Sequence, residues 1–421
     1  MTTNVHRYSS IADVSGLLRH RKLSPIELVR ECLERIEELN PRLNAFITVT
    51  AHQALEQAKR AEAEIVHSKW RGPLHGIPVG VKDFFDTAGV KTTAAFEPFK
   101  NRVPAKDAEV VTRLKNAGAI IVGKMNMHVL GTGTTSTESC FGPVHNPWNV
   151  HYVAGGSSGG SAAAIAAGLC YATVDTDAIG SCRLPASCCG VTGFKPTFGL
   201  ISTRGILEGE PVDEATARTI AWIGHTAFTC RGAEDAAIVL SAIRTPGVGP
   251  RSSPADYRRA FGKPQKARIG AATNYKATQV VRNAFQAAKD VARASGHEVV
   301  DIEVPFGAAS FDLKGIEADR KAIAGSLFKN SELLILPTTT DVPAGIADVN
   351  ASRNPQAISP DNTFFCNYFG LPAVSLPCGF SEDGLPLGLQ VVGPPWSEEL
   401  VLNVAHSFQN STRWHLNHPI D

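Results

Sequence analysis

The chain has 421 residues, of which 43% are hydrophobic, and its 41 basic residues nearly balance its 40 acidic ones. This length suffices for a large hydrophobic core, whereas the near-neutral charge supplies no field that would attract nucleic acid or an anionic membrane. We therefore expect neither of these partners.

The ends of the chain and its cysteines favour a reduced, cytoplasmic protein. Residues 1–16 contain no apolar core of signal-peptide length, and no stretch approaches the roughly 18 apolar residues of a membrane helix. The nine cysteines are an odd number without paired CxxC units. Cys182, Cys188 and Cys189 lie so close together in sequence that we interpret them as small packing residues and not as zinc ligands.

The first 70 residues have the pattern of helices. Ser24-Pro25-Ile26-Glu27 has the spacing of a capping box with proline at the first helical position. Apolar residues then recur at helical spacing, and we expect this helix to end before Pro41. A second helix is expected over residues 51–67. This N-terminal layer suggests packing or a dimer surface, because nothing in it indicates chemistry.

From Gly76 onward, short apolar runs alternate with helical patterns. Alternation of this kind favours an α/β sandwich with a mixed central sheet. A hairpin is expected around Glu382-Asp383-Gly384, and the Gly/Pro-rich residues 246–264 suggest a surface connector. The expected strands are residues 77–81, 119–122, 268–272, 299–304, 333–336, 371–376 and 387–392, and the expected helices are 110–117, 280–294 and 400–408.

Residues 155–199 contain two turns suited to acyl transfer. The first is a glycine–serine loop, residues 155–161, directly before the small helix formers of residues 162–167. Such a loop gathers backbone N–H groups at a helix N-terminus. The second turn, residues 178–181, carries a serine next to a glycine. Together they supply two hydroxyls and two sets of N–H donors.

At these residues the chain resembles the amidase signature family of serine hydrolases. The resemblance rests on motifs that occur in family order over nearly the whole chain. They are GIPVGVKD (76–83), AIIVGKMNM (119–127), FGPVHNPWN (141–149), GGSSGGSAAAIAAG (155–168), the block 175–199, ELLILPTTT (332–340), GLPAVSLPCG (370–379) and GLPLGLQVVG (384–393).

The resemblance implies the roles of three side chains. Lys82 would be the base, Ser157 the proton shuttle, held by a cis peptide after Gly156, and Ser181 the nucleophile. A lysine can serve as a base near neutral pH if burial lowers its pKa, and Lys82 follows an apolar run. Ser–Lys arrangements are known variants of the hydrolase triad.

The resemblance also implies the groups that would contact the substrate. The backbone N–H groups of Ala178, Ile179, Gly180 and Ser181 would bind the oxyanion. Gly131 and Thr132 would line the acyl pocket, in a segment, GTGTTS, that fits either a modest polar substrate or a bulky one. The implied reaction requires neither a metal nor an organic cofactor. By analogy with the family, we also expect a homodimer.

The same resemblance implies a single domain over residues 1–421. It would comprise the helical layer (1–70), a core with the catalytic residues (71–205) and the remaining sheet with a shortened lid and a C-terminal helix (206–421).

Three features depart from the family pattern. Ile179 stands where glycine or alanine is common, and its β-branched side chain would narrow the acyl site or strain the turn. Cys182 replaces a more usual aliphatic residue. The chain is also short between Val304 and Leu333, where a lid is trimmed or a mobile stretch is missing, and substrate choice in the family depends largely on this region.

Other functions fit the sequence less well. The glycine-rich loop lacks the GK[ST] ending of a phosphate-binding loop. We expect a cofactor-independent amidase that converts a small carboxamide to a carboxylate and ammonia or an amine through an acyl-serine. Open alternatives are a ureido-type hydrolase acting on allophanate- or carboxybiuret-like substrates, a transamidosome A-type glutaminase subunit, and an inert binding protein on the same fold.

Overall fold

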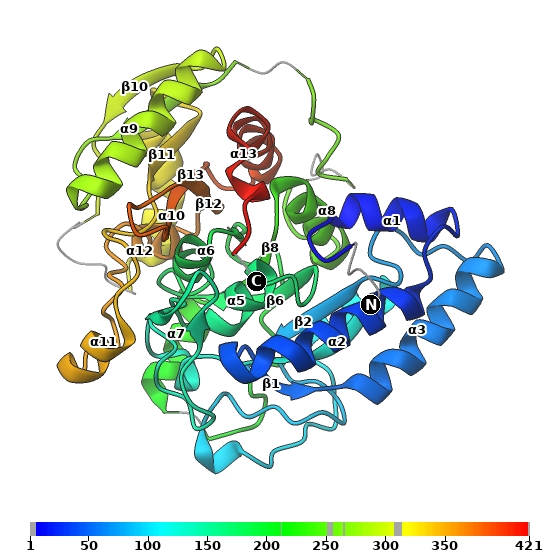
Figure 1. The fold of residues 1–421 in the computed structure, drawn as a ribbon. Coiled ribbons are helices and arrows are strands. Elements are labelled where there is room, and N and C mark those ends of the chain that lie inside the picture. The colour runs from blue at the N-terminus through cyan, green and yellow to red at the C-terminus, as the bar shows by residue number, and fades with distance from the viewer. Residues whose placement is uncertain (1–5, 212, 251–255, 264–265, 307–313, 420–421) are drawn as a thin grey trace.

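The computed structural model describes residues 6–419, except 212, 251–255, 264–265 and 307–313. Its centre is one mixed sheet (Figure 1). In spatial order, the 11 strands that the described residues contribute to this sheet are β1 (Phe46–Val49), β3 (Ile120–Met125), β2 (Pro78–Lys82), β6 (Ala172–Asp177), β8 (His225–Cys230), β7 (Thr192–Lys195), β12 (Ala373–Phe380), β13 (Pro386–Val392), β11 (Leu333–Pro337), β9 (Arg268–Ala272) and β10 (Glu298–Ile302).

The sheet mixes parallel and antiparallel pairs. Strand β2 lies parallel to both β3 and β6, and β9 lies parallel to both β10 and β11. The remaining pairs are antiparallel, including the expected hairpin of β12 and β13. Because β2 and β6 are adjacent and parallel, their carboxyl ends, at Lys82 and Asp177, meet at the same edge of the sheet.

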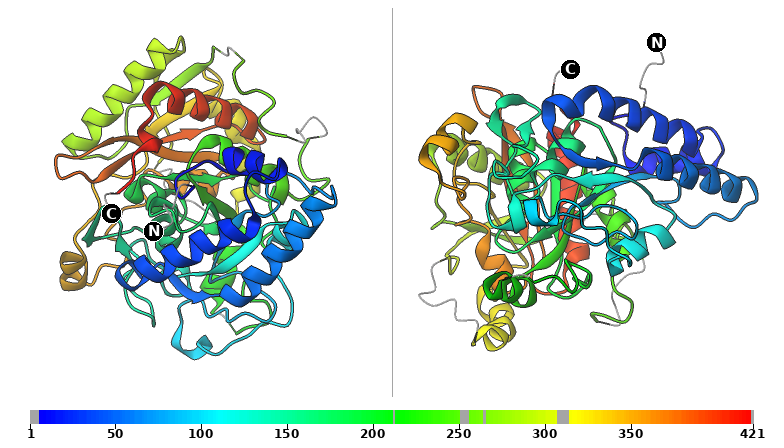
Figure 2. Two further views of the ribbon diagram at one scale, coloured as in Figure 1. Left: turned by 45° about the vertical axis from the view of Figure 1, so that its right-hand side comes forward. Right: turned by 90° about the horizontal axis from the view of Figure 1, so that it is seen from below.

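Helices cover both faces of this sheet (Figures 1 and 2). They are α1 (Ile11–Arg19), α2 (Pro25–Leu43), α3 (Ala51–Val66), α4 (Glu109–Asn116), α5 (Gly159–Ala166), α6 (Arg183–Cys189), α7 (Glu214–Trp222), α8 (Ala233–Ile243), α9 (Gln279–Ala294), α10 (Ile316–Leu327), α11 (Ile346–Ser352), α12 (Phe364–Tyr368) and α13 (Glu398–Thr412). One apolar cluster joins the sheet to α1, α4, α8, α9 and α13. A second joins it to α3, α5 and α6, and α10 and α12 form a third.

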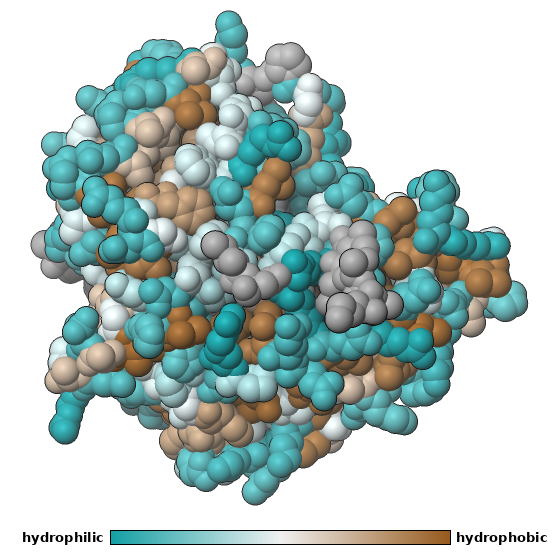
Figure 3. Space-filling view, viewed as in Figure 1, coloured by the Kyte–Doolittle hydropathy of each residue, from teal (hydrophilic) through white to brown (hydrophobic). Residues whose placement is uncertain are grey.

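The fold class expected from the sequence is confirmed. Blue helices α1–α3 lie at the β1 end of the sheet, and α9 and β10 lie at the opposite end (Figure 1). On the face in Figure 3, hydrophobic residues are dispersed among hydrophilic ones. No helix among the described residues is both long and apolar enough to cross a membrane. The sheet takes strands from all three expected parts of the chain, and the single-domain assignment stays a prediction.

The structure corrects two expectations of the sequence analysis. Helix α2 does not end before Pro41 but continues to Leu43. Proline lacks only one helical hydrogen bond there, and the N–H of Asn44 still donates to the carbonyl of Asn40 at 2.7 Å. The N-terminal layer also contributes strand β1 to the sheet. Finally, part of the expected connector, residues 251–255 and 264, and part of the expected short region, residues 307–313, lie outside the described residues.

We expect Ser24→Ala to lower the free energy of unfolding by about 0.5–2 kcal/mol, the usual cost of losing an N-cap. The Ser24 hydroxyl accepts a hydrogen bond from the N–H of Ile26 at 3.0 Å, and the Glu27 carboxylate accepts one from the N–H of Ser24 at 3.1 Å. Urea unfolding followed by circular dichroism measures the change. An unchanged free energy of unfolding would contradict the stabilising role of this cap.

Candidate active site

Lys82 is the last residue of β2, and its side chain is fully buried. Its ammonium nitrogen donates to three hydroxyl oxygens, those of Ser157 at 2.7 Å, Ser158 at 2.8 Å and Thr176 at 2.9 Å. Burial disfavours the charged form and lowers the pKa of Lys82 to about 8, while nearby negative charge, chiefly that of Asp175, opposes this shift. A neutral amine is therefore accessible near physiological pH.

The glycine–serine loop lies between β5 (Asn149–Val153) and α5. The peptide bond between Gly156 and Ser157 is cis, as the family resemblance implies. Both serine hydroxyls of the loop contact Lys82, but only Ser157 also lines the cavity described below. The Ser158 hydroxyl points instead toward the carbonyl of Thr176, at 3.5 Å. Ser157 is therefore the one of the two that can exchange a proton with a group in the cavity.

Ser181 lies on the turn that connects β6 to α6. It is 3% exposed and lines the same cavity as Ser157. The N–H of Ser158 donates to the carbonyl of Ser181 at 3.1 Å, so the two serine loops are directly joined. In the described part of the chain, no hydrogen bond links the Ser157 and Ser181 hydroxyls. Transfer of a proton between them requires a closer approach than this structure has, a common feature of sites without substrate.

The Ser181 turn is shaped by Asp177, which is fully buried. Its carboxylate accepts from the N–H of Gly180 at 2.8 Å and from the Arg183 guanidinium at two positions, both at 2.9 Å. Burial acts to raise the pKa of Asp177, but Arg183 outweighs it and holds that pKa well below its usual range. Asp177 and Arg183 thus form a buried ion pair that shapes the turn.

The donors available for an oxyanion follow from this arrangement. The Gly180 N–H is occupied by Asp177. Within the described residues, the N–H groups of Ala178, Ile179 and Ser181 have no hydrogen-bond partner. Three of the four N–H groups that the resemblance implied are thus free to bind a substrate oxygen. The fourth, that of Gly180, donates to Asp177 within the turn.

Ile179 fits the turn without the backbone strain that its β-branched side chain suggested. The positive φ of the turn, 129°, occurs at Gly180, and Ile179 has none. A Cβ atom at position 180 would lie 2.4 Å from the Thr363 hydroxyl and 2.9 Å from Leu184, so glycine is required there. The Ile179 side chain lines the cavity and packs against the cluster that contains α12.

The cavity beside these loops has a volume of about 330 Å³. The residues named from the sequence that line it are Ser157, Ser181, Ala178, Ile179, Gly131 and Thr132. Lys82, which contacts Ser157, and Gly180 are not among the lining residues. Hollows of 320–480 Å³ also occur along α1–α4, but they contain none of these residues.

Several residues of the site were missed by sequence reasoning. Thr176 is the third partner of Lys82, and its place in the run Asp175-Thr176-Asp177 at a strand end is a signal that could have identified it. Helix α7 presents Thr216, Thr219 and Ile220 to the cavity. These three positions have the i, i+3, i+4 spacing of one helical face, but no sequence motif marks them as site residues.

The chain is similar to known proteins over nearly its whole length. A family model described as Amidase matches residues 27–314 and 313–402. The A-type subunit of the glutamyl-tRNA(Gln) amidotransferase from Trichormus variabilis is 32% identical over 494 aligned positions, which cover 98% of this chain and 99% of that protein.

Two solved structures are similar over nearly their whole length. A 6-aminohexanoate cyclic dimer hydrolase complexed with substrate has a TM-score of 0.86 and 25% identity, with 98% of this chain and 99% of that chain covered. The peptide amidase of Stenotrophomonas maltophilia has a TM-score of 0.83 and 25% identity, with 98% of each chain covered.

We expect kcat/KM for amide hydrolysis to rise with pH and to level off above about pH 8, the pKa of Lys82. Only the neutral amine can accept a proton, and its fraction falls about tenfold for each pH unit below the pKa. Initial rates between pH 5.5 and 10 measure this profile. A rate that is constant between pH 6 and 9 would contradict Lys82 as the base.

We expect Ser157→Ala to lower kcat/KM by about 10²- to 10⁴-fold, the range for lost general acid–base catalysis. Ser158→Ala is the matched control, because it removes a hydroxyl that contacts Lys82 at nearly the same distance but does not line the cavity. Its loss of activity should be clearly smaller. Equal losses in the two variants would show that both hydroxyls serve only to hold Lys82.

Proposed function

The chain belongs to the amidase family, whose hydrolases act on C–N bonds, and we propose that it hydrolyses a linear small-molecule carboxamide through an acyl-Ser181 intermediate. The products are a carboxylate and ammonia or an amine. One observation carries this proposal: a buried lysine of lowered pKa contacts Ser157, and Ser157 shares a cavity with Ser181.

The proposed reaction begins with a relayed proton transfer. Neutral Lys82 accepts the proton of the Ser157 hydroxyl while Ser157 accepts that of Ser181. The Ser181 oxygen forms a bond to the amide carbon, and the negative charge that develops on the carbonyl oxygen is stabilised by the N–H groups of Ile179 and Ser181, with that of Ala178 nearby. The proton then returns through Ser157 to the amide nitrogen as the C–N bond breaks.

The second half of the reaction releases the acid. Water attacks the carbonyl carbon of the acyl-enzyme and gives a proton to Ser157, which is again coupled to Lys82. The ester bond to Ser181 breaks, Ser181 recovers its proton, and the carboxylate product leaves. Both halves use the same base and the same N–H donors, as in other acyl-enzyme hydrolases.

The cavity lining supports an uncharged substrate with an apolar part. Its apolar side chains are those of Phe84, Leu130, Ile179, Ile206 and Ile220. The charged residue among the lining, Asp213, accepts hydrogen bonds from the N–H and hydroxyl of Thr216 at the start of α7. Burial keeps the pKa of the lining His225 well below its usual value, so this imidazole is neutral.

The comparisons favour one further candidate, glutamine. The relative from Trichormus variabilis is named as part of an amidotransferase and matches over nearly its full length, which supports a glutaminase that works with partner proteins. Free glutamine carries an ammonium and a carboxylate, and the described lining provides no cationic side chain for the carboxylate. For this reason we rank the uncharged carboxamide first.

Partners and location follow from the same reasoning. A homodimer and a cytoplasmic location stay predictions, the second supported by nine cysteines that are all free thiols. No step of the proposed reaction uses a metal ion or an organic cofactor.

We expect the wild-type protein to release ammonia from at least one member of a panel of aliphatic, aromatic and ureido amides and L-glutamine, and Ser181→Ala to abolish that release. The preferred member identifies the acyl pocket, and preference for L-glutamine would select the glutaminase. Labelling of Ser181 by a fluorophosphonate, read by mass spectrometry, is the parallel measurement. Absence of both turnover and labelling would show that the fold serves binding alone.

A further inference from the structure

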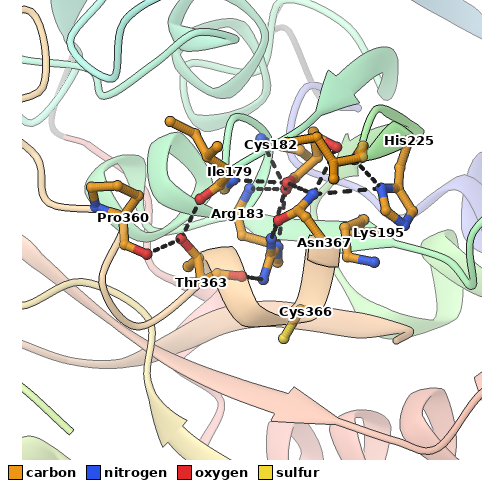
Figure 4. Close-up of polar contacts among 12 residues, drawn as sticks. Ile179, Cys182, Arg183, Lys195, His225, Pro360, Thr363, Cys366 and Asn367 are labelled. Carbon is orange, nitrogen blue, oxygen red and sulfur yellow. Dashed lines mark hydrogen bonds and ion pairs between the residues drawn. The ribbon is translucent and has the colours of Figure 1, made fainter. Parts of the chain in front are cut away.

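The Ser181 turn depends on an element that lies far from it in sequence. Thr363 directly precedes α12, and its hydroxyl donates to the carbonyl of Ile179 at 2.5 Å. Its side chain is fully buried. The same hydroxyl lies 3.1 Å from the carbonyl of Pro360, and the shorter contact is the one to Ile179. Figure 4 shows Thr363 between Ile179 and Pro360.

The Ile179 carbonyl belongs to the same peptide unit as the Gly180 N–H. That unit is therefore held at both ends, by Thr363 at its oxygen and by Asp177 at its nitrogen, where the contact measures 2.8 Å. Loss of either bond would free the backbone torsions of Ile179 and Gly180, the two residues that link this unit to the neighbouring peptide units, which carry the N–H groups of Ile179 and Ser181. These are the two N–H groups that the proposed function assigns to the oxyanion, and both residues line the cavity.

Steric restraint cannot fix this peptide unit, because one of its two flanking residues is glycine. Glycine at φ 129° has broad conformational freedom. Hydrogen bonds must set the orientation instead, and one of the two that do so comes from Thr363.

Helix α12 is itself firmly attached to the turn. The Asn367 amide donates to the carbonyl and the carboxylate of Asp177, at 2.8 and 2.9 Å. The Arg183 guanidinium donates to the carbonyl of Thr363 at 3.1 Å and to the Asn367 side chain at 2.6 Å (Figure 4). These bonds fix the position of the Thr363 hydroxyl relative to the turn.

We propose that Thr363 is a positioning residue for catalysis: its hydroxyl holds the Ile179–Gly180 peptide unit in the orientation that directs the N–H groups of Ile179 and Ser181 at the substrate oxygen. This inference rests on the proposed function, since it assigns these N–H groups to the oxyanion. Thr363 touches neither the substrate nor the reacting atoms and acts through the peptide unit alone.

The test compares Thr363→Val, which removes the hydroxyl and keeps the branched shape, with Thr363→Ser, which keeps the hydroxyl. We expect Thr363→Val to lower kcat by about 10- to 100-fold with little change in KM, less than the roughly 10²- to 10³-fold loss when an oxyanion donor is removed outright. Thr363→Ser should retain most of the wild-type kcat. The rate constant for labelling of Ser181 by a fluorophosphonate should fall in parallel.

Thr338→Val is the matched control. Thr338 is also fully buried, and its hydroxyl bonds to that of Ser375 at 2.8 Å, away from the turn. If Thr363→Val does not fold, as judged by circular dichroism, the pair Thr363→Ala and Thr363→Ser isolates the hydroxyl, because both lose the methyl group.

Each outcome decides the proposal. It is overturned if Thr363→Val keeps the wild-type kcat, if only KM changes, if Thr363→Ser is as impaired as the valine or alanine variant, or if Thr338→Val loses as much activity. The Ser181→Ala variant in the same assays distinguishes failure of the proposed function from failure of the positioning role. Activity that survives in Ser181→Ala refutes the proposed function, whereas activity lost there but intact in Thr363→Val refutes the positioning role alone.

Discussion

The buried carboxylate of Asp177 is the interaction on which the site depends. It ends strand β6 and accepts hydrogen bonds from the backbone of the Ser181 turn, from Arg183 and from Asn367. A lone carboxylate at this depth would be strongly unfavourable, and the guanidinium and amide donors compensate for the lost hydration. The same bonds join the turn to α12. Local geometry at the proposed nucleophile and long-range packing are therefore set by one group.

Lys82 shows how a buried cation becomes a base. Lys124 and Lys195 are also fully buried, and burial lowers the pKa of Lys195 to about 7. However, Lys124 lies 3.4 Å from the Asp83 carboxylate and donates to the Phe85 carbonyl, and Lys195 donates to the backbone carbonyls of Pro196 and Leu371. Lys82 alone among these three donates to a hydroxyl that lines the cavity. Lowered pKa is common to buried lysines, and the hydroxyl partner determines which one can do chemistry.

Part of the cavity lining comes from a segment outside the sequence motifs. Helix α7 provides one wall of the cavity, and none of its described side chains is fully buried in the protein core. The relative from Trichormus variabilis aligns over 494 positions against 421 residues here, and the family model matches in two segments that meet at residues 313–314. This chain therefore aligns with almost the whole of that relative while being shorter than it.

The sequence by itself indicated seven of the sheet strands after Gly76 and singled out Lys82, Ser157 and Ser181 as the proposed catalytic residues, because periodicity and family motifs are local properties of the chain. It did not predict the central strands β6, β7 and β8. It failed at Pro41 and at β1, where helix ends and edge strands depend on neighbouring segments. Only the tertiary structure showed that the N–H of Gly180 donates to the Asp177 carboxylate and that the Thr363 hydroxyl donates to the carbonyl of Ile179. The residues of the second contact lie 184 positions apart, and a hydrogen bond over that separation leaves no local signal, since it forms only when β6 and α12 pack together.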